Sequence, residues 1–225
     1  MSRTPILAVS ILAADFAHLG DALHQAEEGG ADWIHIDVMD GHFVPPLTMG
    51  TPIVEACRRT TDLPLDVHLM VDRPEDLISS FAHAGADSIT VHVEAATHLH
   101  RCLQTIRELG VRAGVALNPT TPISAVEEAL TYTDLVLIMT VDPGYAGQSL
   151  IPSALDKVQR LRYLLQASGS SVRLQVDGGI NAQTASQAVR QGADVLVAAQ
   201  AVFGHPQGVA AGVRALRASL QPALA

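Results

Sequence analysis

The sequence predicts an α/β fold in which eight parallel strands, each followed by a helix, close into a barrel. Short apolar runs alternate with amphipathic segments of helical length along the whole chain. Such alternation produces right-handed crossovers and a parallel sheet, and eight units suit a closed (β/α)8 or TIM barrel better than an open sheet. A length of 225 residues is common for one such barrel. We therefore expect residues 1–225 to form a single TIM-barrel domain.

The strands are expected where short apolar runs are bounded by turn residues. They cover residues 6–10, 33–38, 65–70, 88–93, 112–117, 135–141, 173–177 and 194–198. A weak internal repeat supports this count, because GADWIHI, GADSITV and GADVLVA each follow a helical stretch and lead into a strand. The glycines of the repeat, Gly30, Gly85 and Gly192, suit the position just after a helix, where a positive φ angle is common.

Composition and charge exclude several classes of protein. The formal net charge is -9 and the basic residues are scattered, which disfavours binding to nucleic acid or to an anionic membrane. No stretch approaches the roughly 20 apolar residues that span a bilayer, and the start of the chain lacks a signal-peptide pattern. Cys57 and Cys102 lie in helical stretches without the spacing of a disulfide framework or a zinc motif. We expect a cytoplasmic protein with reduced, structural thiols.

Polar side chains gather at the ends of the expected strands, where the active sites of such barrels lie. In chain order they are Ser10, His35, Asp37, His68, His92, Glu94, Asn118, Asp142 and Asp177. The segment WIHIDVMDGHFVP shows why this matters, because side chains on a strand alternate between its two faces. Its aliphatic residues share one face, whereas His35, Asp37 and Met39 share the other.

Four of these residues are expected to converge at the open end of the barrel: His35, Asp37, His68 and Asp177. Two imidazoles and two carboxylates suit a borderline divalent ion such as Zn²⁺, Fe²⁺, Mn²⁺ or Co²⁺ better than Mg²⁺ or Ca²⁺. On the residues alone, the alternative is that the histidines are hydrogen-bonded core residues. The convergence of four candidate ligands favours a metal site.

Two glycine-containing turns indicate how a substrate is held. VDPGYAGQS carries Gly144 and Gly147, as expected of a mobile loop that covers a site. VDGGIN follows the seventh strand and leads into a helix expected to begin near Asn181, which is the usual phosphate-binding arrangement in these barrels. The alternative is that both are simple tight turns. Any phosphate would depend mainly on backbone amides, because no lysine lies at a strand end.

The lysine content also excludes one class of barrel enzyme. Lys157 is the only lysine in the chain, and it falls on the helix that follows the sixth strand. An aldolase that forms a Schiff base needs a lysine on the catalytic face. That mechanism is therefore excluded for this chain.

Several segments together resemble the ribulose-phosphate 3-epimerase family nearly from end to end. They are VSILAADF, WIHIDVMDGHFVP, LPLDVHLMV, AGVALNPTTP, LVLIMTVDPGYAGQS, VDGGI and AVFG. The resemblance implies a metal-dependent isomerase of carbohydrate metabolism, in the pentose phosphate pathway, that epimerises C3 of D-ribulose 5-phosphate to give D-xylulose 5-phosphate. Its expected partners are a small sugar phosphate and further copies of the same chain.

The resemblance also implies a role for each matching residue. His35, Asp37, His68 and Asp177 would bind the divalent metal, while Asp37 and Asp177 would exchange protons with the substrate through a cis-enediolate. The remaining substrate contacts would come from Ser10, His68, Gly144, Tyr145, Ala146, Gly147, Asp177, Gly178, Gly179, Ala199 and Gln200. The residues expected to cap the reacting carbon are Met39, Met70 and Met139, although these methionines could equally fill gaps in the packing.

The sequence departs from the family pattern at two places in the expected phosphate region. Ala199 and Gln200 stand where the family usually has Gly-Ser, and Ala146 stands where a second glycine is usual. A D-allulose 6-phosphate 3-epimerase, which acts on a hexulose phosphate, is therefore the second hypothesis. A barrel that binds a sugar phosphate or metal without turnover is a third, although it has no need of two proton-transfer carboxylates. A metal-free barrel resembling the phosphoribosyl-binding isomerases does not explain the strand-end histidines.

Overall fold

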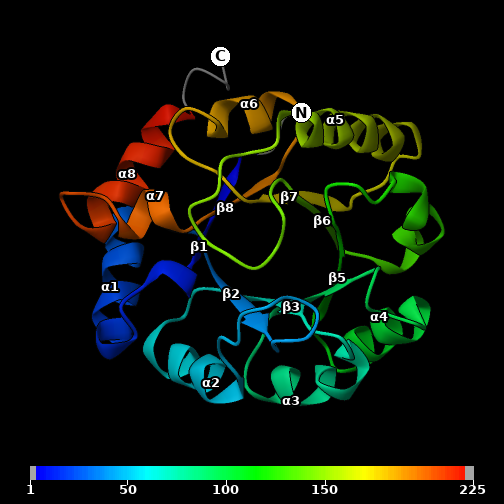
Figure 1. Ribbon diagram of the computed structural model, residues 1–225, viewed down its shortest axis with the longest axis horizontal. Helices are drawn as coiled ribbons and strands as arrows, with labels where there is room; N and C mark the ends of the chain where they lie inside the picture. Colours follow the sequence, from blue (N-terminus) through cyan, green and yellow to red (C-terminus); the bar gives the residue numbers. More distant parts are fainter. Residues whose placement is uncertain (1–3, 221–225) are drawn as a thin grey trace.

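The computed structural model describes residues 4–220, which form a closed barrel of parallel strands inside a ring of helices (Figure 1). The strands pair in chain order from β1 to β8, and β8 pairs with β1 to close the ring. Their bounds are β1 Ile6–Ser10, β2 Trp33–Met39, β3 Leu65–Met70, β4 Ser88–His92, β5 Arg112–Leu117, β6 Leu135–Met139, β7 Arg173–Asp177 and β8 Val195–Ala198. The predicted fold class is confirmed.

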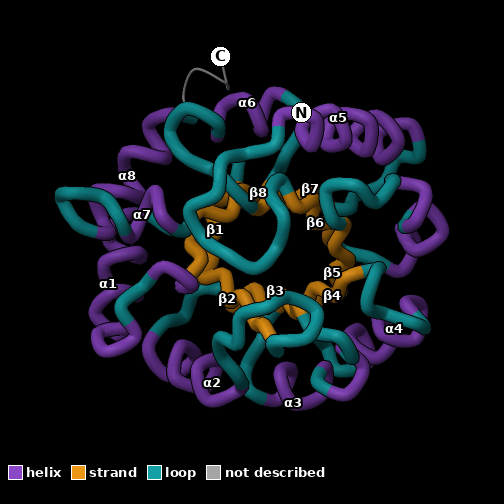
Figure 2. The backbone as a smooth tube through the Cα atoms, in the orientation of Figure 1, coloured by secondary structure: helices purple, strands orange, loops and turns teal. Residues whose placement is uncertain are grey.

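The helices lie outside the strands and leave the barrel mouth to the loops (Figure 2). They are α1 Leu19–Gly29, α2 Thr51–Thr60, α3 Ile78–His83, α4 Leu99–Glu108, α5 Pro152–Ala167, α6 Ala185–Arg190, α7 Gln200–Phe203 and α8 Val209–Ser219. Several short 3₁₀ turns complete the connections. No helix within residues 4–220 is both long and apolar enough to cross a membrane.

Each strand is buried on both faces, which is why the aliphatic runs in the sequence are so continuous. On β2, the outward-facing Ile34, Ile36 and Val38 pack in the large apolar layer between strands and helices. The inward-facing His35 and Asp37 are also buried, at 0% and 3% exposure. The predicted alternation on this strand is therefore confirmed, and it places polar groups inside the barrel.

Two element boundaries differ from the sequence predictions by more than one residue. Strand β6 ends at Met139 rather than residue 141, because Thr140 turns toward β7, where its hydroxyl donates to the backbone carbonyls of Asp177 and Gly178. Helix α6 begins at Ala185 rather than near Asn181. The Asn181 side chain instead accepts hydrogen bonds from the backbone N–H groups of Gln183 and Thr184 and caps a turn that leads into the helix.

The repeated glycines lie at the ends of helices, as predicted. Gly30, Gly85 and Gly192 have φ angles of +90°, +109° and +105°. Arginine side chains pack directly against two of them, because a Cβ atom on Gly85 or Gly192 would overlap Arg58 or Arg162, respectively. These glycines therefore allow both the left-handed turn and a close contact on the side of the barrel where the strands begin.

Two loops fold over the end of the barrel where the strands finish. One joins β2 to α2 and the other joins β6 to α5, and both cross the mouth in Figures 1 and 2. They also contact each other, since a Cβ atom on Gly144 would lie 3.5 Å from Val44 and 3.6 Å from Pro46. The loops thus enclose the space above the inward-facing polar residues.

Candidate active site

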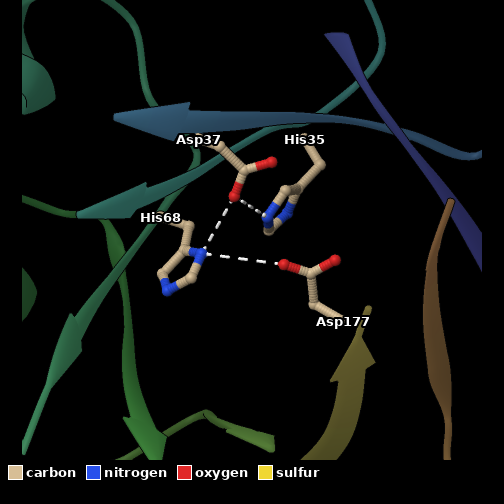
Figure 3. Close-up of side chains that lie close together, drawn as sticks. All are labelled: His35, Asp37, His68 and Asp177. Atoms are coloured by element: carbon tan, nitrogen blue, oxygen red, sulfur yellow. Dashed lines mark hydrogen bonds and ion pairs between the residues drawn. The ribbon is translucent and has the colours of Figure 1, made fainter. Parts of the chain in front are cut away.

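Four predicted ligands meet at the centre of the barrel: His35, Asp37, His68 and Asp177 (Figure 3). His35 Nε2 lies 3.2 Å from Asp37 Oδ1, and His68 Nδ1 lies 3.0 Å from the same oxygen. The Asp177 carboxylate approaches from β7, with Oδ2 4.0 Å from His68 Nδ1. One donor atom from each residue falls within 4.8 Å of all the others.

The strand register explains this convergence. His35 and Asp37 are separated by two residues on β2, so both point inward, and Asp37 is level with His68 on β3. Asp177 is the last residue of β7, where it is level with Met139 on β6. The strands that supply these side chains are far apart in the sequence, and closure of the barrel brings their ends to one point.

Ser10 contacts this cluster from the end of β1. Its hydroxyl donates to Asp37 Oδ2 at 2.6 Å and also accepts a hydrogen bond from the backbone N–H of Leu12. Ser10 is 1% exposed, so these contacts hold it in the floor of the cavity described below. Asp37 therefore receives hydrogen bonds on both oxygens, which favours its ionised form.

Asp66, to which the sequence analysis assigned no role, orients His35. Its Oδ2 atom lies 2.8 Å from His35 Nδ1 and accepts a further hydrogen bond from Gln175 Nε2 at 2.6 Å. Ser88 donates to the other oxygen. Because an ionised Asp66 accepts the hydrogen bond from Nδ1–H, the Nε2 atom of His35 faces the cluster, where a metal ion would take the place of its proton. The alternation along β3 puts Asp66 on the same face as His68, which was the available signal.

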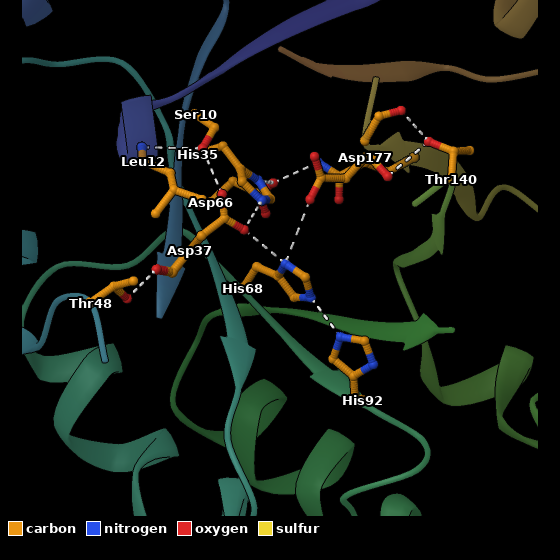
Figure 4. A network of polar contacts seen from close by, with 12 residues as sticks. Ser10, Leu12, His35, Asp37, Thr48, Asp66, His68, His92, Thr140 and Asp177 are labelled. Carbon is orange, nitrogen blue, oxygen red and sulfur yellow. Dashed lines mark hydrogen bonds and ion pairs between the residues drawn. The ribbon is translucent and has the colours of Figure 1, made fainter. Parts of the chain in front are cut away.

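A second chain of contacts leads from His68 to β4 (Figure 4). His68 Nε2 lies 2.8 Å from His92 Nε2, and His92 Nδ1 lies 3.1 Å from Glu94 Oε2. Both imidazoles are fully buried, and their rings stack with centroids 5.0 Å apart. Sequence analysis placed His92 and Glu94 at a strand end but gave them no role.

The two carboxylates of the cluster differ in acidity. Burial alone would raise the pKa of Asp37, but the charge of His35 and hydrogen bonds from both histidines hold it well below its usual range. Burial and the neighbouring charge of Asp37 raise the pKa of Asp177 to about 7. Near neutral pH, Asp37 is therefore a carboxylate, while Asp177 carries a proton for much of the time. Paired carboxyl groups of opposite protonation state are typical of acid–base sites.

The histidines also differ. Burial would lower the pKa of His35, yet the carboxylates of Asp37 and Asp66 raise it well above its usual value. Burial and the neighbouring imidazoles lower the pKa of His68 to about 4, against the opposing hydrogen bond to Asp37. His68 is thus neutral near pH 7, which is the form of imidazole that binds a metal, whereas His35 would give up its Nε2 proton when a metal binds.

A cavity of about 260 Å³ lies directly above the cluster. It is somewhat smaller than the roughly 300–1,000 Å³ of sites for drug-sized ligands and suits a small metabolite. Most of the predicted substrate contacts line it: Ser10, Asp37, Met39, Met70, Met139, Gly144, Tyr145, Ala146, Gly147, Asp177, Gly178, Gly179, Ala199 and Gln200. His35 and His68 lie beneath its floor, with no exposed surface.

The Gly178–Gly179 turn forms one wall of the cavity. The two residues have φ angles of +115° and +66°, which favour glycine. A Cβ atom on Gly178 would lie 2.9 Å from the backbone nitrogen of Val141, and one on Gly179 would lie 2.8 Å from the Leu150 Cα atom. The turn is therefore packed tightly against the loop between β6 and α5.

Comparison with known proteins gives a consistent result. The model of the ribulose-phosphate 3-epimerase family matches residues 6–203. A curated relative from Bacillus subtilis, named ribulose-phosphate 3-epimerase, is 53% identical over 200 residues, which are 88% of this chain and 92% of the relative. The chain belongs to the ribulose-phosphate 3-epimerase family.

Other members of the ribulose-phosphate 3-epimerase family match over a similar extent. The enzyme of that name from Synechocystis is 48% identical across 99% of this chain and 97% of its own length. A chloroplastic ribulose-5-phosphate-3-epimerase from Arabidopsis thaliana is 47% identical across 97% of this chain and 78% of the relative. The resemblance recognised in the sequence motifs is therefore confirmed.

Among solved structures, the fold is shared well beyond the ribulose-phosphate 3-epimerase family. KGPDC from Streptococcus mutans, solved in complex with D-R5P, matches with a TM-score of 0.74 at 16% identity, over 98% of this chain and 99% of that one. At such low identity the likeness shows the barrel fold alone.

The two departures from the ribulose-phosphate 3-epimerase pattern lie on the cavity wall. Ala146 belongs to the loop between β6 and α5, and Ala199 and Gln200 lie at the start of α7. The Gln200 side chain is exposed and runs along α7, where an ideal Cβ atom on Gly204 would lie 2.5 Å from its Nε2 atom. The absence of a side chain at Gly204 thus leaves room for the longer amide.

Proposed function

We propose that this chain interconverts D-ribulose 5-phosphate and D-xylulose 5-phosphate by epimerisation at C3, with a bound divalent metal. The observation that carries this proposal is the pair of carboxyl groups, Asp37 and Asp177, in the floor of a small cavity beside two histidines. Membership of the family supplies the reaction.

The donor set suits a divalent cation. His35 Nε2, His68 Nδ1 and one oxygen each from Asp37 and Asp177 are close enough together to surround one ion, and hydrogen bonds from outside the cluster orient both imidazoles. Mixed nitrogen and oxygen donors favour Zn²⁺, Fe²⁺, Mn²⁺ or Co²⁺ over Mg²⁺. When bound, such an ion supplies Lewis-acid stabilisation of the negative charge that develops on the substrate oxygens.

The protein's own groups carry out the proton transfers. Removal of the C3 proton beside the C2 carbonyl gives a cis-enediolate, and return of a proton to the opposite face inverts the centre. In one direction the ionised Asp37 accepts the proton and the protonated Asp177 donates its own. The two residues exchange roles in the reverse direction. Their positions on β2 and β7 support attack from two sides of a substrate held between them.

The remaining lining residues bind and enclose the substrate. Met39, Met70 and Met139 lie around the cavity floor, where thioethers exclude water from the reacting carbon. The phosphate would be held at the opposite wall by the backbone of the Gly178–Gly179 turn and of the segment Gly144–Gly147, together with Ala199 and Gln200. Ser10 would contact the sugar.

The hexulose phosphate of the second hypothesis is favoured by one observation. Gln200 extends an amide at the cavity wall in place of the compact serine that is usual in the family, and its contacts could fit a longer substrate. The pentulose phosphate remains our proposal because the whole-chain matches carry the pentulose name.

A turnover panel of pentulose 5-phosphates and hexulose 6-phosphates in D₂O tests these assignments. We expect D-ribulose 5-phosphate to be the preferred substrate and to gain one deuterium at C3. A clear preference for D-allulose 6-phosphate would support the second hypothesis. Binding of the sugar phosphate without deuterium incorporation would identify a non-catalytic barrel and overturn the proposed function.

We further propose the setting in which this activity operates. The negative net charge of -9 supports a protein that binds neither nucleic acid nor anionic membranes. We also propose that the protein is cytoplasmic and that it forms a homo-oligomer. Light scattering of the purified protein measures the number of subunits.

A further inference from the structure

His92 is a buried polar residue and its partner Glu94 is partly exposed, and the proposed proton transfers use neither of them. His92 is fully buried between His68 and Phe43, whose ring centroid lies 4.7 Å away. Glu94 lies just beyond the end of β4 and accepts from the His92 ring. Burying an imidazole is costly unless its hydrogen bonds are satisfied, and Glu94 satisfies one of those of His92.

The contacts of Glu94 leave it one orientation. Its Oε1 atom accepts from the backbone N–H of Asn118 at 2.7 Å and from the hydroxyl of Thr121. Its Oε2 atom is thereby turned toward His92 Nδ1. Burial would raise the pKa of Glu94, but these hydrogen bonds lower it to about 2, so Oε2 is an ionised acceptor.

The chain's single lysine holds the other side of the same turn. Lys157 Nζ donates to the backbone carbonyls of Asn118, Pro119 and Thr121, at 2.8, 2.7 and 2.7 Å. Lys157 therefore binds the carbonyl groups of the turn after β5, and Glu94 binds the N–H and hydroxyl groups of the same turn. This rigid support is what aims the Glu94 carboxylate at His92.

The hydrogen bonds then determine where the ring protons lie. An ionised Glu94 can only accept, so the neutral form of His92 carries its proton on Nδ1 and presents a lone pair at Nε2. The 2.8 Å contact between the two Nε2 atoms needs one proton, which must come from His68. In the metal-binding form, a neutral His68 protonated on Nε2 has a lone pair on Nδ1, where the metal would replace the hydrogen bond that Nδ1 gives to Asp37 in the metal-free protein.

We propose that Glu94 and His92 are positioning residues that hold His68 in the tautomer whose Nδ1 atom binds the metal. Asp66 performs the same task for His35 by a direct contact, whereas His68 is reached through a relay of two side chains. The inference rests on the proposed metal-dependent function. It adds that the metal affinity depends on a carboxylate that contacts neither metal nor substrate.

Glu94→Gln tests the relay because it reverses one hydrogen bond. The Gln oxygen must stay with the Asn118 N–H and the Thr121 hydroxyl, so its amide N–H₂ group points at His92 Nδ1. His92 must then move its proton to Nε2, where it opposes the Nε2 proton of a metal-binding His68. We expect the affinity of the metal-free protein for Zn²⁺, measured by competition with a chelating dye, to fall about 10- to 100-fold.

A spectroscopic measurement separates the relay from a simple loss of charge. In zinc-loaded protein with ¹⁵N-labelled histidine, the NMR spectrum of the unmodified chain should show His92 protonated on Nδ1, and that of Glu94→Gln should show it on Nε2. The control is Glu108→Gln, which removes the same charge from the exposed end of α4 and should keep both the affinity and the spectrum.

The outcomes distinguish the relay from the proposed function. Failure of the unmodified chain to bind Zn²⁺ would overturn the proposed function. If the unmodified chain binds Zn²⁺, two results would overturn the relay alone. One is an unchanged affinity in Glu94→Gln, and the other is a reduced affinity while the His92 proton stays on Nδ1. Should Glu94→Gln fail to fold, the spectrum of the unmodified chain still decides, because a His92 proton on Nε2 contradicts the inference.

Discussion

At the scale of single residues, the site depends on opposite behaviour from chemically similar groups. Asp37 and Asp177 are both aspartates in the floor of one cavity, yet the first is held ionised by two histidines and the second is driven toward its neutral form by burial and by the first. Neither property belongs to the residue type. Each arises from the neighbours that the barrel supplies.

The first prediction concerns these carboxylates. Asp37→Asn and Asp177→Asn should each fold normally but lower kcat by about three orders of magnitude or more, because each change removes a proton-transfer group and a charged ligand. Steady-state kinetics and circular dichroism measure the two effects. Asp142→Asn is the control, since Asp142 is an exposed carboxylate in the loop between β6 and α5. Near-normal turnover in either site variant would contradict the proposed roles.

The second prediction concerns the departure from the family pattern. Changing Ala199→Gly and Gln200→Ser together should open backbone amides to the phosphate and supply a compact hydroxyl. Each hydrogen bond to a charged group is worth roughly 1.5 to 3 kcal/mol, so KM for ribulose 5-phosphate should fall about tenfold with little change in kcat. A higher KM, together with loss of activity on a hexulose phosphate, would instead identify Gln200 as a contact adapted to that longer substrate.

At the scale of elements, turns after strands determine the shape of the site. The turn after β5 aims Glu94, the Gly178–Gly179 turn after β7 forms a cavity wall, and the loop after β6 covers the mouth. Each is held by side chains or backbone from another element, as in the contact between Gly179 and Leu150. Loops on such a barrel carry the function because the strands beneath them are rigid.

The third prediction concerns the close approach at Gly179. Gly179→Ala should destabilise the fold by about 2 kcal/mol or more, since the new methyl adds backbone strain and overlaps the Leu150 backbone. Gly169→Ala is a matched control, because Gly169 has a φ of +64°, close to the +66° of Gly179, but nothing within 4 Å of its would-be Cβ atom. Denaturant unfolding should show that Gly179→Ala lowers the free energy of unfolding about twice as much as Gly169→Ala does. Equal losses would mean that the contact with Leu150 is easily relieved.

The fourth prediction concerns the acid sensitivity of the turn after β5. The pKa of Glu94 is lowered to about 2 from an ordinary value of 4.5, so its ionised form stabilises the fold above about pH 4.5, and this contribution is lost as pH falls toward 2. This shift in the pKa of Glu94 corresponds to a contribution of at most about 3 kcal/mol to the free energy of unfolding. In metal-free protein, the free energy of unfolding of the unmodified chain should therefore exceed that of Glu94→Gln at pH 5, and this difference should shrink as pH falls to 2. A difference that does not change with pH would contradict this account.

At the scale of the whole molecule, the site exists because the barrel closes. The metal-ligand candidates come from β2, β3 and β7, and only a ring of eight strands brings the ends of these strands to one axis. The polar interior is surrounded by a continuous apolar layer between strands and helices. That layer supplies the stability that offsets the burial of histidines and carboxylates.

The fifth prediction follows from a metal held between distant strands. Chelation should abolish epimerase activity while leaving the barrel folded, and Zn²⁺, Fe²⁺, Mn²⁺ or Co²⁺ should restore activity better than Mg²⁺. Because the ion binds only the folded state, saturation at about 100 times Kd should add roughly 2.7 kcal/mol and raise Tm by several degrees. Calorimetry with and without the ion measures this. A fully active preparation free of metal would contradict the proposal.

Much of this protein is determined by its sequence alone. The period-two alternation on β2 and β3 requires His35, Asp37 and His68 to face inward, since the opposite faces are aliphatic and pack under the helices. The eight strand–helix units and the family motifs predict the barrel and the expected ligands. The end of β6 and the start of α6 were less predictable, because a hydrogen bond from the Thr140 hydroxyl to the end of β7 decides the first and a local turn capped by the Asn181 side chain decides the second.

Only the tertiary structure decided how these residues act on one another. Asp66 and His92 look like ordinary buried polar residues in the sequence, and their contacts with His35 and His68 depend on the register between neighbouring strands. The pKa difference between Asp37 and Asp177 likewise depends on burial and on charges that are distant in the chain. A local pattern determines which way a side chain points, whereas electrostatic energies and hydrogen-bond partners depend on distances that only the closed barrel sets.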